Sequence, residues 1–188
     1  MIALVLALMC CVPMWAGTLT RAMADTSNVG GASVDAGGAR DQSFLADSNY
    51  SGGATAGNNG QTGNPNSPLT VAHPIPVNDW NSYRYLDNTY TIPALAPGAS
   101  YQVRLYFLEW YWTKVGKRAF NVSINGTPAL TNFDILQASA NAGGDGTHQG
   151  VEKDFTAVAD ADGNITIAFS RGTADQALVN AISVVPAS

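Results

Sequence analysis

Aromatic side chains are concentrated in one part of the chain and are the residues best suited to contact a ligand. Ten of the 16 aromatic residues beyond position 24 fall between Trp80 and Trp112, and the run Trp110-Tyr111-Trp112 is consecutive. Successive side chains of an extended strand face opposite sides, so at least one of these rings must lie at the surface or beside a pocket. An aromatic ring can stack on the C–H face of a pyranose while hydroxyl and carboxylate groups bond the sugar's hydroxyls. The cluster therefore indicates a carbohydrate site, and a Tyr- and Trp-rich core with an exposed ring at a subunit contact is the alternative.

Carboxylates and histidines supply the other candidate chemistry. Glu109 lies beside the aromatic cluster, and a glycoside hydrolase would need a second carboxylate, for which Asp175 is a candidate, at roughly 5–10 Å. His73 and His148 stand in polar loops without a cysteine or second histidine at metal-ligand spacing, which favours solvated histidines over a metal site. The chain has no G-x-S-x-G, P-loop or G-x-G-x-x-G motif. We therefore expect no catalytic residue, metal or cofactor.

One segment partly matches a calcium-binding loop. Asp160, Asp162 and Asn164 surround a glycine, but the segment lacks the downstream bidentate glutamate of such loops. Its Asp-Gly pair also stands where a hairpin turn is needed. A turn is favoured, and a structural Ca²⁺ is the alternative.

The composition excludes several classes of protein. Of 188 residues, 46% are hydrophobic and 12% are charged, and the formal net charge is −5. This balance disfavours helical bundles and coiled coils, which depend on Leu, Glu, Lys and Ala. Basic residues are scattered apart from Lys117-Arg118, so neither nucleic acid nor an anionic membrane is expected as a partner. The length is sufficient for one domain with its own core.

Alternating apolar and polar residues predict the strands that must position these side chains. The expected strands are 101–109, 119–125, 128–133, 151–159, 164–169 and 178–185, with Tyr101, Val103, Leu105, Phe107, Phe120, Val122, Ile124, Ile165, Ile167 and Phe169 facing inward. Asn125-Gly126 and Asp160–Gly163 are typical of hairpin turns, and Gly52–Pro68 is predicted to be a loop. No window of ten or more residues beyond the leader has a helical stripe. The predicted fold class is all-β, a single-domain, antiparallel, jelly-roll-like β-sandwich.

Residues 1–24 are predicted to be a signal peptide. Met1–Ala16 is an uncharged apolar run, and Ala22 and Ala24 form an A-x-A site that would give a mature start at Asp25. The run is shorter than the roughly 20 residues of a membrane span, which favours cleavage over the alternative of an uncleaved anchor. Cys10 and Cys11 lie in this segment, so the mature chain would have no disulfide. Residues 25–31 are expected to be a disordered lead-in, and 32–188 the β-sandwich domain.

Six groups of motifs follow one another along nearly the whole mature chain. They are Val34–Gly38 with Phe44–Asp47 and Tyr50–Gly53, then Tyr83–Tyr85, Tyr101–Trp112, Lys117–Gly126, Asn132–Ile135 and Asp175–Ile182. Their order and spacing resemble malectin-type carbohydrate-binding domains. The third is similar to that family's V-R-L-x-F-A-E-x-Y-[FW] strand, and the fourth to its R-x-F-D-V-x-I-N-G segment.

The resemblance implies a jelly-roll sandwich that binds glucose-type oligosaccharides in a loop pocket without catalysis. Its pocket residues fall on Tyr85, Tyr111, Trp112 and Asp175. The rings of Tyr111 and Trp112 would stack on sugar faces, Tyr85 would add a wall and a hydroxyl, and Asp175 would accept hydrogen bonds from two hydroxyls. The resemblance makes Glu109 a structural residue at the strand end.

The chain departs from the family pattern in its first long loop, where Gly57–Asn66 has no aromatic residue to match a family tyrosine. Trp80 or Tyr83 is the candidate to fill that place. Trp110 replaces a small aliphatic residue, and it either extends the aromatic platform or covers the core.

Three classes of function remain. The favoured one is a secreted, non-catalytic domain, at the cell surface or outside the cell after bacterial Sec-type export, that binds a neutral carbohydrate. The alternative is an extracellular assembly or adhesion subunit that self-associates into a fibre or surface layer. The third is a glycoside hydrolase.

Overall fold

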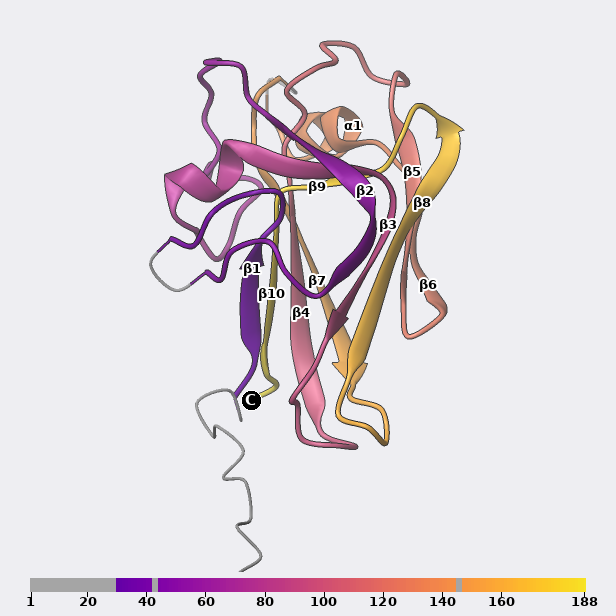
Figure 1. The fold of residues 1–188 in the computed structure, drawn as a ribbon. Coiled ribbons are helices and arrows are strands. Elements are labelled where there is room, and N and C mark those ends of the chain that lie inside the picture. Colours follow the sequence, from indigo (N-terminus) through magenta and orange to yellow (C-terminus); the bar gives the residue numbers. More distant parts are fainter. Residues whose placement is uncertain (1–29, 42–43, 145–146) are drawn as a thin grey trace, which may run out of the picture.

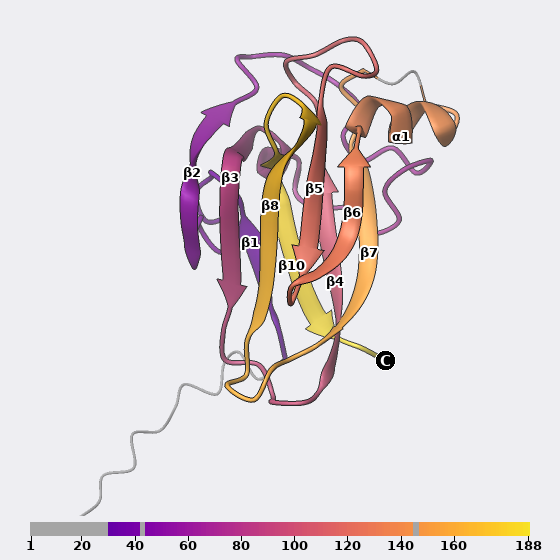
Figure 2. The ribbon, with the colours of Figure 1, turned by 90° about the vertical axis from the view of Figure 1, so that its right-hand side faces the viewer.

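The computed structural model describes residues 30–41, 44–144 and 147–188, and their strands form two antiparallel sheets. The first sheet has the order β1-β10-β4-β7, and the second has the order β2-β3-β8-β5-β6 with β9 paired to β3 (Figures 1 and 2). The strands are β1 Ala32–Asp35, β2 Tyr50–Gly57, β3 Ser82–Ile92, β4 Ser100–Phe107, β5 Ala119–Ile124, β6 Thr127–Phe133, β7 Val151–Val158, β8 Ile165–Ala174, β9 Leu178–Val179 and β10 Ala181–Pro186. The predicted single-domain, all-β sandwich is confirmed.

The main core lies between the two sheets, and alternation in the sequence places its side chains there. All ten residues predicted to face inward, from strands β4, β5 and β8, are at most 7% exposed. The Asn125-Gly126 turn joins β5 to β6 with positive φ at both residues, as a two-residue hairpin loop with the right-handed twist requires. The Asp160–Gly163 turn also forms, since the Asp160 carboxylate accepts from the amides of Asp162 and Asn164.

Three strands and two short helices carry no clear periodic signal and were not expected. β2 lies at a sheet edge, is largely exposed, and has a bulge at Gly52 and Gly53, both with positive φ, so part of the predicted loop 52–68 is a strand. β3 pairs with β2, β8 and β9 in turn, and Leu86, with φ of 69°, interrupts its alternation. β1 has four residues, η2 spans Val77–Trp80, and α1 spans Ile135–Asn141.

The predicted last strand is divided between the two sheets at Asn180. β9 pairs with β3 in one sheet and β10 with β4 in the other. The wholly buried Asn180 side chain donates to the carbonyls of Trp80 and Ser82 and accepts from the amide of Leu108. One apolar stretch therefore crosses between sheets, because a buried amide bonds the backbone where the ladder hydrogen bonds stop.

A second, smaller core covers the outer side of the four-stranded sheet. It consists of Phe44, Val71, Ile75, Trp80, Tyr106, Leu108, Trp110 and Ala181. The Trp80 and Tyr106 rings meet edge to face at 5.7 Å. The segment before η2 and η2 itself thus pack on β4 and β10.

The predicted signal peptide of residues 1–24, with Cys10 and Cys11, lies outside the described residues, as does most of the predicted lead-in 25–31. Gly30 and Gly31 are described and precede β1. Among the described residues, no helix is long and apolar enough to cross a membrane.

Two carboxyl groups, on η2 and β1, are buried. Asp79 is wholly buried, and neither of its carboxyl oxygens has a hydrogen-bond partner among the described residues. Burial, with the charges of Asp35 and Asp41, raises the pKa of Asp79 to about 7. Burial also raises the pKa of Asp35 to about 6, although the hydroxyl of Ser82 bonds its carboxylate and opposes the rise.

These raised pKa values predict that the protein loses stability as the pH rises. Between pH 4 and 7 the folded state holds protons that the unfolded state, with a carboxyl pKa near 3.8, has released, so the free energy of unfolding falls. Asp79→Asn removes one of these titrating groups, so the decrease in the free energy of unfolding should become smaller by a few kcal/mol. One pKa unit corresponds to about 1.4 kcal/mol. Urea unfolding at pH 4.5 and pH 8 measures the difference. If the unaltered protein and Asp79→Asn lost equal stability between these pH values, the raised pKa of Asp79 would be contradicted.

Candidate functional site

A hollow of about 270 Å³ opens at the end of the sandwich where β2 ends and β3 begins. Ala56, Tyr83, Tyr85, Tyr111, Arg118, Asp175 and Gln176 line it. These residues come from β2, β3, the segment between β4 and β5, and the segment between β8 and β9. The structure thus brings together three of the four predicted site residues, Tyr85, Tyr111 and Asp175, from positions up to 90 apart in the sequence. The fourth, Trp112, adjoins them without lining the hollow.

A buried ion pair holds the segments around this hollow. The Arg118 Nε donates to Glu109 Oε2 at 2.5 Å, and the two side chains are 7% and 1% exposed. Arg118 Nη1 donates to the carbonyl of Gln176 at 2.6 Å, and Nη2 lies 3.2 Å from Asp175 Oδ2. One guanidinium therefore connects the end of β4, the start of β5 and the segment before β9, as its planar set of five donors allows.

Glu109 also fixes the direction of the aromatic run that follows it. Its Oε1 accepts from the backbone amides of Tyr111 at 2.9 Å and Trp112 at 3.1 Å. The chain turns at this point, so Tyr111 is 70% exposed while Trp110 turns inward. The structural role that the family resemblance implies for Glu109 agrees with these contacts.

Asp175 lies between the aromatic run and the ion pair. Trp112 Nε1 donates to its Oδ2 at 2.6 Å, and its side chain is 29% exposed. The Asp175 backbone has φ of 53°, a left-handed conformation that is uncommon for a residue other than glycine. Because Oδ2 carries the contacts to Trp112 and Arg118, Oδ1 is the oxygen that the described residues leave to accept from a ligand.

Aromatic side chains form the walls of the hollow. The Tyr83 and Tyr85 rings, two residues apart on one face of β3, meet edge to face at 6.0 Å. The Tyr111 and Trp112 rings also meet edge to face, at 4.7 Å and 87°. Burial raises the pKa of Tyr83, while the charge of Arg118 opposes the rise, so Tyr83 keeps its hydroxyl proton at neutral pH and can donate it.

The two other tryptophan candidates lie elsewhere, and the expectation that Trp80 could join the site is corrected. Trp80 and Trp110 are 0% and 4% exposed and belong to the second core. The Trp110 Nε1 donates to the carbonyl of Trp80 at 2.8 Å, so both are held by packing and by this hydrogen bond. Trp110 therefore covers the core instead of extending the platform. Tyr83, the other candidate, does line the hollow.

Sequence reasoning missed Arg118, Gln176 and Ala56 as lining residues. The sequence shows Arg118 as half of the single basic pair and as the arginine of the Lys117–Gly126 motif, and neither pattern indicates burial against Glu109. In the first long loop, which has no aromatic residue, Gln61 donates its side-chain amide to the Trp110 carbonyl at 2.9 Å. That loop therefore binds the backbone of the aromatic run at Trp110.

Comparison with known proteins gives one family and a set of similar folds. The profile of the Malectin domain matches residues 26–182. The extracellular domains of ANXUR1 and ANXUR2 from Arabidopsis thaliana superpose with TM-scores of 0.70 and 0.69 at 18% identity, covering 82% of this chain and 47% and 48% of theirs. A β-glucuronidase of Bacteroides uniformis superposes with a TM-score of 0.59 at 18% identity, over 84% of this chain and 18% of its own. No curated protein sequence matches.

These superpositions show a shared fold and nothing more specific. The chain spans about half the length of the ANXUR domains and less than a fifth of the β-glucuronidase.

We expect Arg118→Met to destabilise the protein strongly. Removing one partner of a buried ion pair leaves the Glu109 carboxylate unpaired and costs about 3–5 kcal/mol. Lys114→Met is the matched control, since Lys114 is exposed on the same segment and its loss should cost less than about 0.5 kcal/mol. Urea unfolding measures both values. Equal, small losses would show that the pair does not hold the site.

Proposed function

Because the chain belongs to the Malectin domain family, we propose that it is a secreted, non-catalytic carbohydrate-binding domain whose ligand is a neutral, glucose-type oligosaccharide. The observation that carries the proposal is the hollow in which Tyr85, Tyr111 and Asp175 meet. A volume of about 270 Å³ is of the size that one or two pyranose rings would occupy.

Tyr111 supplies the stacking surface. The residue is 70% exposed and its backbone is held by Glu109, so less backbone ordering is needed when a ligand binds. Trp112 supports Tyr111 through the edge-to-face contact and keeps Asp175 in place with its Nε1. Stacking on the Trp112 face as well would require a ligand that extends beyond the hollow.

Hydrogen-bonding groups around the ring are suited to sugar hydroxyls. Asp175 Oδ1 accepts, the Gln176 side chain lines the same wall, and the hydroxyls of Tyr83 and Tyr85 can donate or accept. Such a site, apolar on one side and polar at its edge, matches the two faces of a pyranose.

The charges around the hollow favour a neutral ligand. Arg118 is already paired with Glu109 and Asp175, at 2.5 and 3.2 Å, so its guanidinium has no free charge to offer an anionic sugar. An anionic ligand would also approach two carboxylates.

The burial and hydrogen bonds of Glu109 support a non-catalytic function. A glycosidase acid must reach the scissile oxygen, whereas Glu109 is 1% exposed and both its oxygens are bonded by Arg118 or by backbone amides. Asp175 would then have no partner carboxylate able to reach the same ligand.

The proposed location is outside the cell or at its surface, reached by Sec-type export through the segment 1–24. The names of the structurally similar ANXUR proteins describe extracellular domains. A second candidate function is an extracellular assembly subunit, since Tyr111 and Val115 expose 70% and 49% of their surface on one segment and could form a subunit contact.

We expect a glycan array and isothermal titration to detect maltose- or cellulose-type oligosaccharides with millimolar to micromolar affinity. Tyr111→Ala should weaken binding at least about tenfold, because it removes the stacking ring from an exposed position without disturbing the core. Tyr111→Phe, which keeps the ring, is the matched control and should retain most of the affinity. Circular dichroism checks that each variant is folded.

Two outcomes would contradict the proposal. No binding on a broad array would leave the assembly function, which ordered polymers in sedimentation or microscopy would support. Binding that Tyr111→Ala leaves unchanged would place the carbohydrate site elsewhere.

A further inference from the structure

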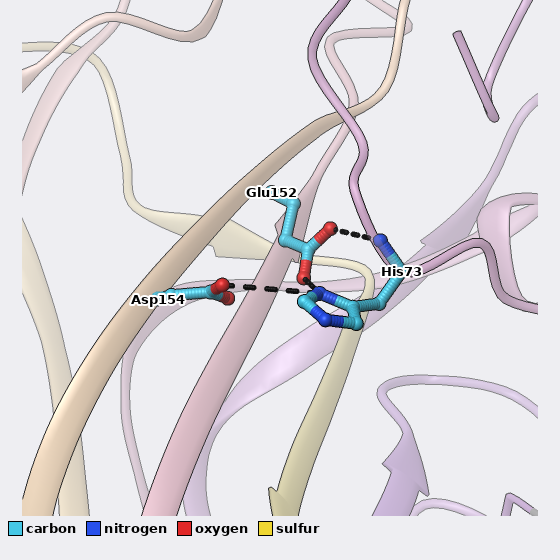
Figure 3. Close-up of side chains that lie close together, drawn as sticks. All are labelled: His73, Glu152 and Asp154. Carbon is cyan, nitrogen blue, oxygen red and sulfur yellow. Dashed lines mark hydrogen bonds and ion pairs between the residues drawn. The ribbon is translucent and has the colours of Figure 1, made fainter. Parts of the chain in front are cut away.

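Three potential metal ligands meet on the outer side of the four-stranded sheet, away from the residues that line the hollow. Glu152 and Asp154 are two residues apart on β7 and so face the same side, and His73 comes from the segment that precedes η2 (Figure 3). Among the described residues, this is the one group of three or more His, Asp or Glu side chains whose ligand atoms all lie within 4.8 Å of one another.

Both carboxylates point at the same ring nitrogen. His73 Nδ1 lies 2.6 Å from Glu152 Oε1 and 3.8 Å from Asp154 Oδ2 (Figure 3). The other oxygen of Glu152 accepts from the His73 backbone amide at 2.7 Å, which fixes the direction of the carboxylate. Since Nδ1 can carry a single proton, it can bond one of the two carboxylates well and leaves Asp154 without a short hydrogen bond from it.

The group is rich in negative charge and partly buried. Glu152 is 4% exposed, while His73 and Asp154 are 46% and 43% exposed, so one side is open to solvent. Burial and the neighbouring Glu152 raise the pKa of Asp154, while the charges of His73 and Arg104 oppose the rise. Arg104 Nε lies 3.9 Å from Glu152 Oε1, so the guanidinium neutralises the pair only in part.

We propose that His73 Nδ1, Glu152 Oε1 and Asp154 Oδ2 form a binding site for a divalent transition-metal cation, with Zn²⁺ as the ion that suits the donors best. Zn²⁺ takes imidazole and carboxylate ligands at about 2.0–2.2 Å in a tetrahedron, which places ligand atoms about 3.4 Å apart. The present separations of 2.6 and 3.8 Å lie on either side of that value, so small side-chain rotations make room for the ion. The solvent-exposed side leaves a fourth position for water.

The donor atoms, one imidazole nitrogen and two carboxylate oxygens, favour Zn²⁺ over Ca²⁺ and Mg²⁺. Ca²⁺ takes six to eight oxygen ligands, and Mg²⁺ keeps most of its water, whereas an imidazole nitrogen suits zinc and its neighbours in the transition series. Arg104 is a repulsive charge beside the site, and Lys153 on β7 faces the other side of the strand, where its Nζ lies over the Phe133 ring. Two carboxylates lie beside this one guanidinium, so the net charge of the group favours a cation.

A bound ion would fasten the segment before η2 to β7. That segment already contacts the β7 region through Thr70, whose hydroxyl donates to the Gly150 carbonyl and whose carbonyl accepts from the Glu152 amide. Val71 and Ile75, on either side of His73, belong to the second core. An ion that binds only the folded state would therefore stabilise the packing of the segment before η2 in the second core.

Titration of the full-length, metal-free chain with Zn²⁺, Ca²⁺ and Mg²⁺, followed by calorimetry and by the thermal midpoint, tests the site. We expect one equivalent of Zn²⁺ to bind and raise the Tm, with no response to Ca²⁺ or Mg²⁺. His73→Ala, Glu152→Gln and Asp154→Asn should each weaken Zn²⁺ binding at least about tenfold, as losses of ligands or their partners typically do. Asp154 is exposed enough that its variant should fold even if Glu152→Gln does not.

Matched controls exclude other ligands. His148→Ala removes the one other histidine, and Cys10→Ser with Cys11→Ser removes both thiols; neither change should alter Zn²⁺ affinity. Co²⁺ in place of Zn²⁺ should give visible d–d bands without a thiolate charge-transfer band. Absence of saturable Zn²⁺ binding, or a response to Ca²⁺ alone, would overturn the proposal. So would binding that His73→Ala abolishes but both carboxylate variants leave unchanged, which would indicate a solitary surface histidine.

Discussion

The ion pair of Glu109 and Arg118 is the interaction on which the candidate carbohydrate site depends. Glu109 alone receives the Arg118 guanidinium and the amides of Tyr111 and Trp112, and Arg118 extends to Asp175 and Gln176. Buried charges are costly unless they are paired and fully hydrogen-bonded, and these groups satisfy one another. The pair thereby joins the segment between β4 and β5 to the segment between β8 and β9, and together they form one preorganised wall.

The same arrangement explains how a chain with few charges makes a defined polar site. An exposed ring and a free carboxylate oxygen are useful to a ligand only if their positions are fixed, and here they are fixed by charges that are paired with one another. Arg118 is neutralised within the wall, so the surface offered to a ligand is aromatic and hydrogen-bonding instead of cationic. The low charge content of the sequence therefore fits a site in which most charges are structural.

Sequence periodicity was sufficient to predict the central strands. It was not sufficient to predict the edge strand β2 or the contacts of the candidate site. β4, β5 and β8 alternate because one face of each is buried, and their inward residues were predicted correctly. β2 was missed since both its faces are largely exposed and its bulge glycines resemble loop residues, and the division at Asn180 depends on backbone groups from distant segments. Tyr85, Tyr111 and Asp175 were predicted as site residues through the family resemblance, and the structure places them around one hollow. The contacts of Arg118, and the meeting of His73 with Glu152 and Asp154, join residues 9 to 81 positions apart and leave no local pattern.

The central claim is that a sugar ring lies against Tyr111 with its hydroxyls directed at Asp175. A crystal structure of the chain with a bound glucose-type oligosaccharide tests it most directly. The account predicts a pyranose stacked on the Tyr111 ring, with Asp175 Oδ1 accepting from a hydroxyl and Arg118 still paired with Glu109. An oligosaccharide bound on another face, or one bound in the hollow without contact to Tyr111 and Asp175, would contradict it.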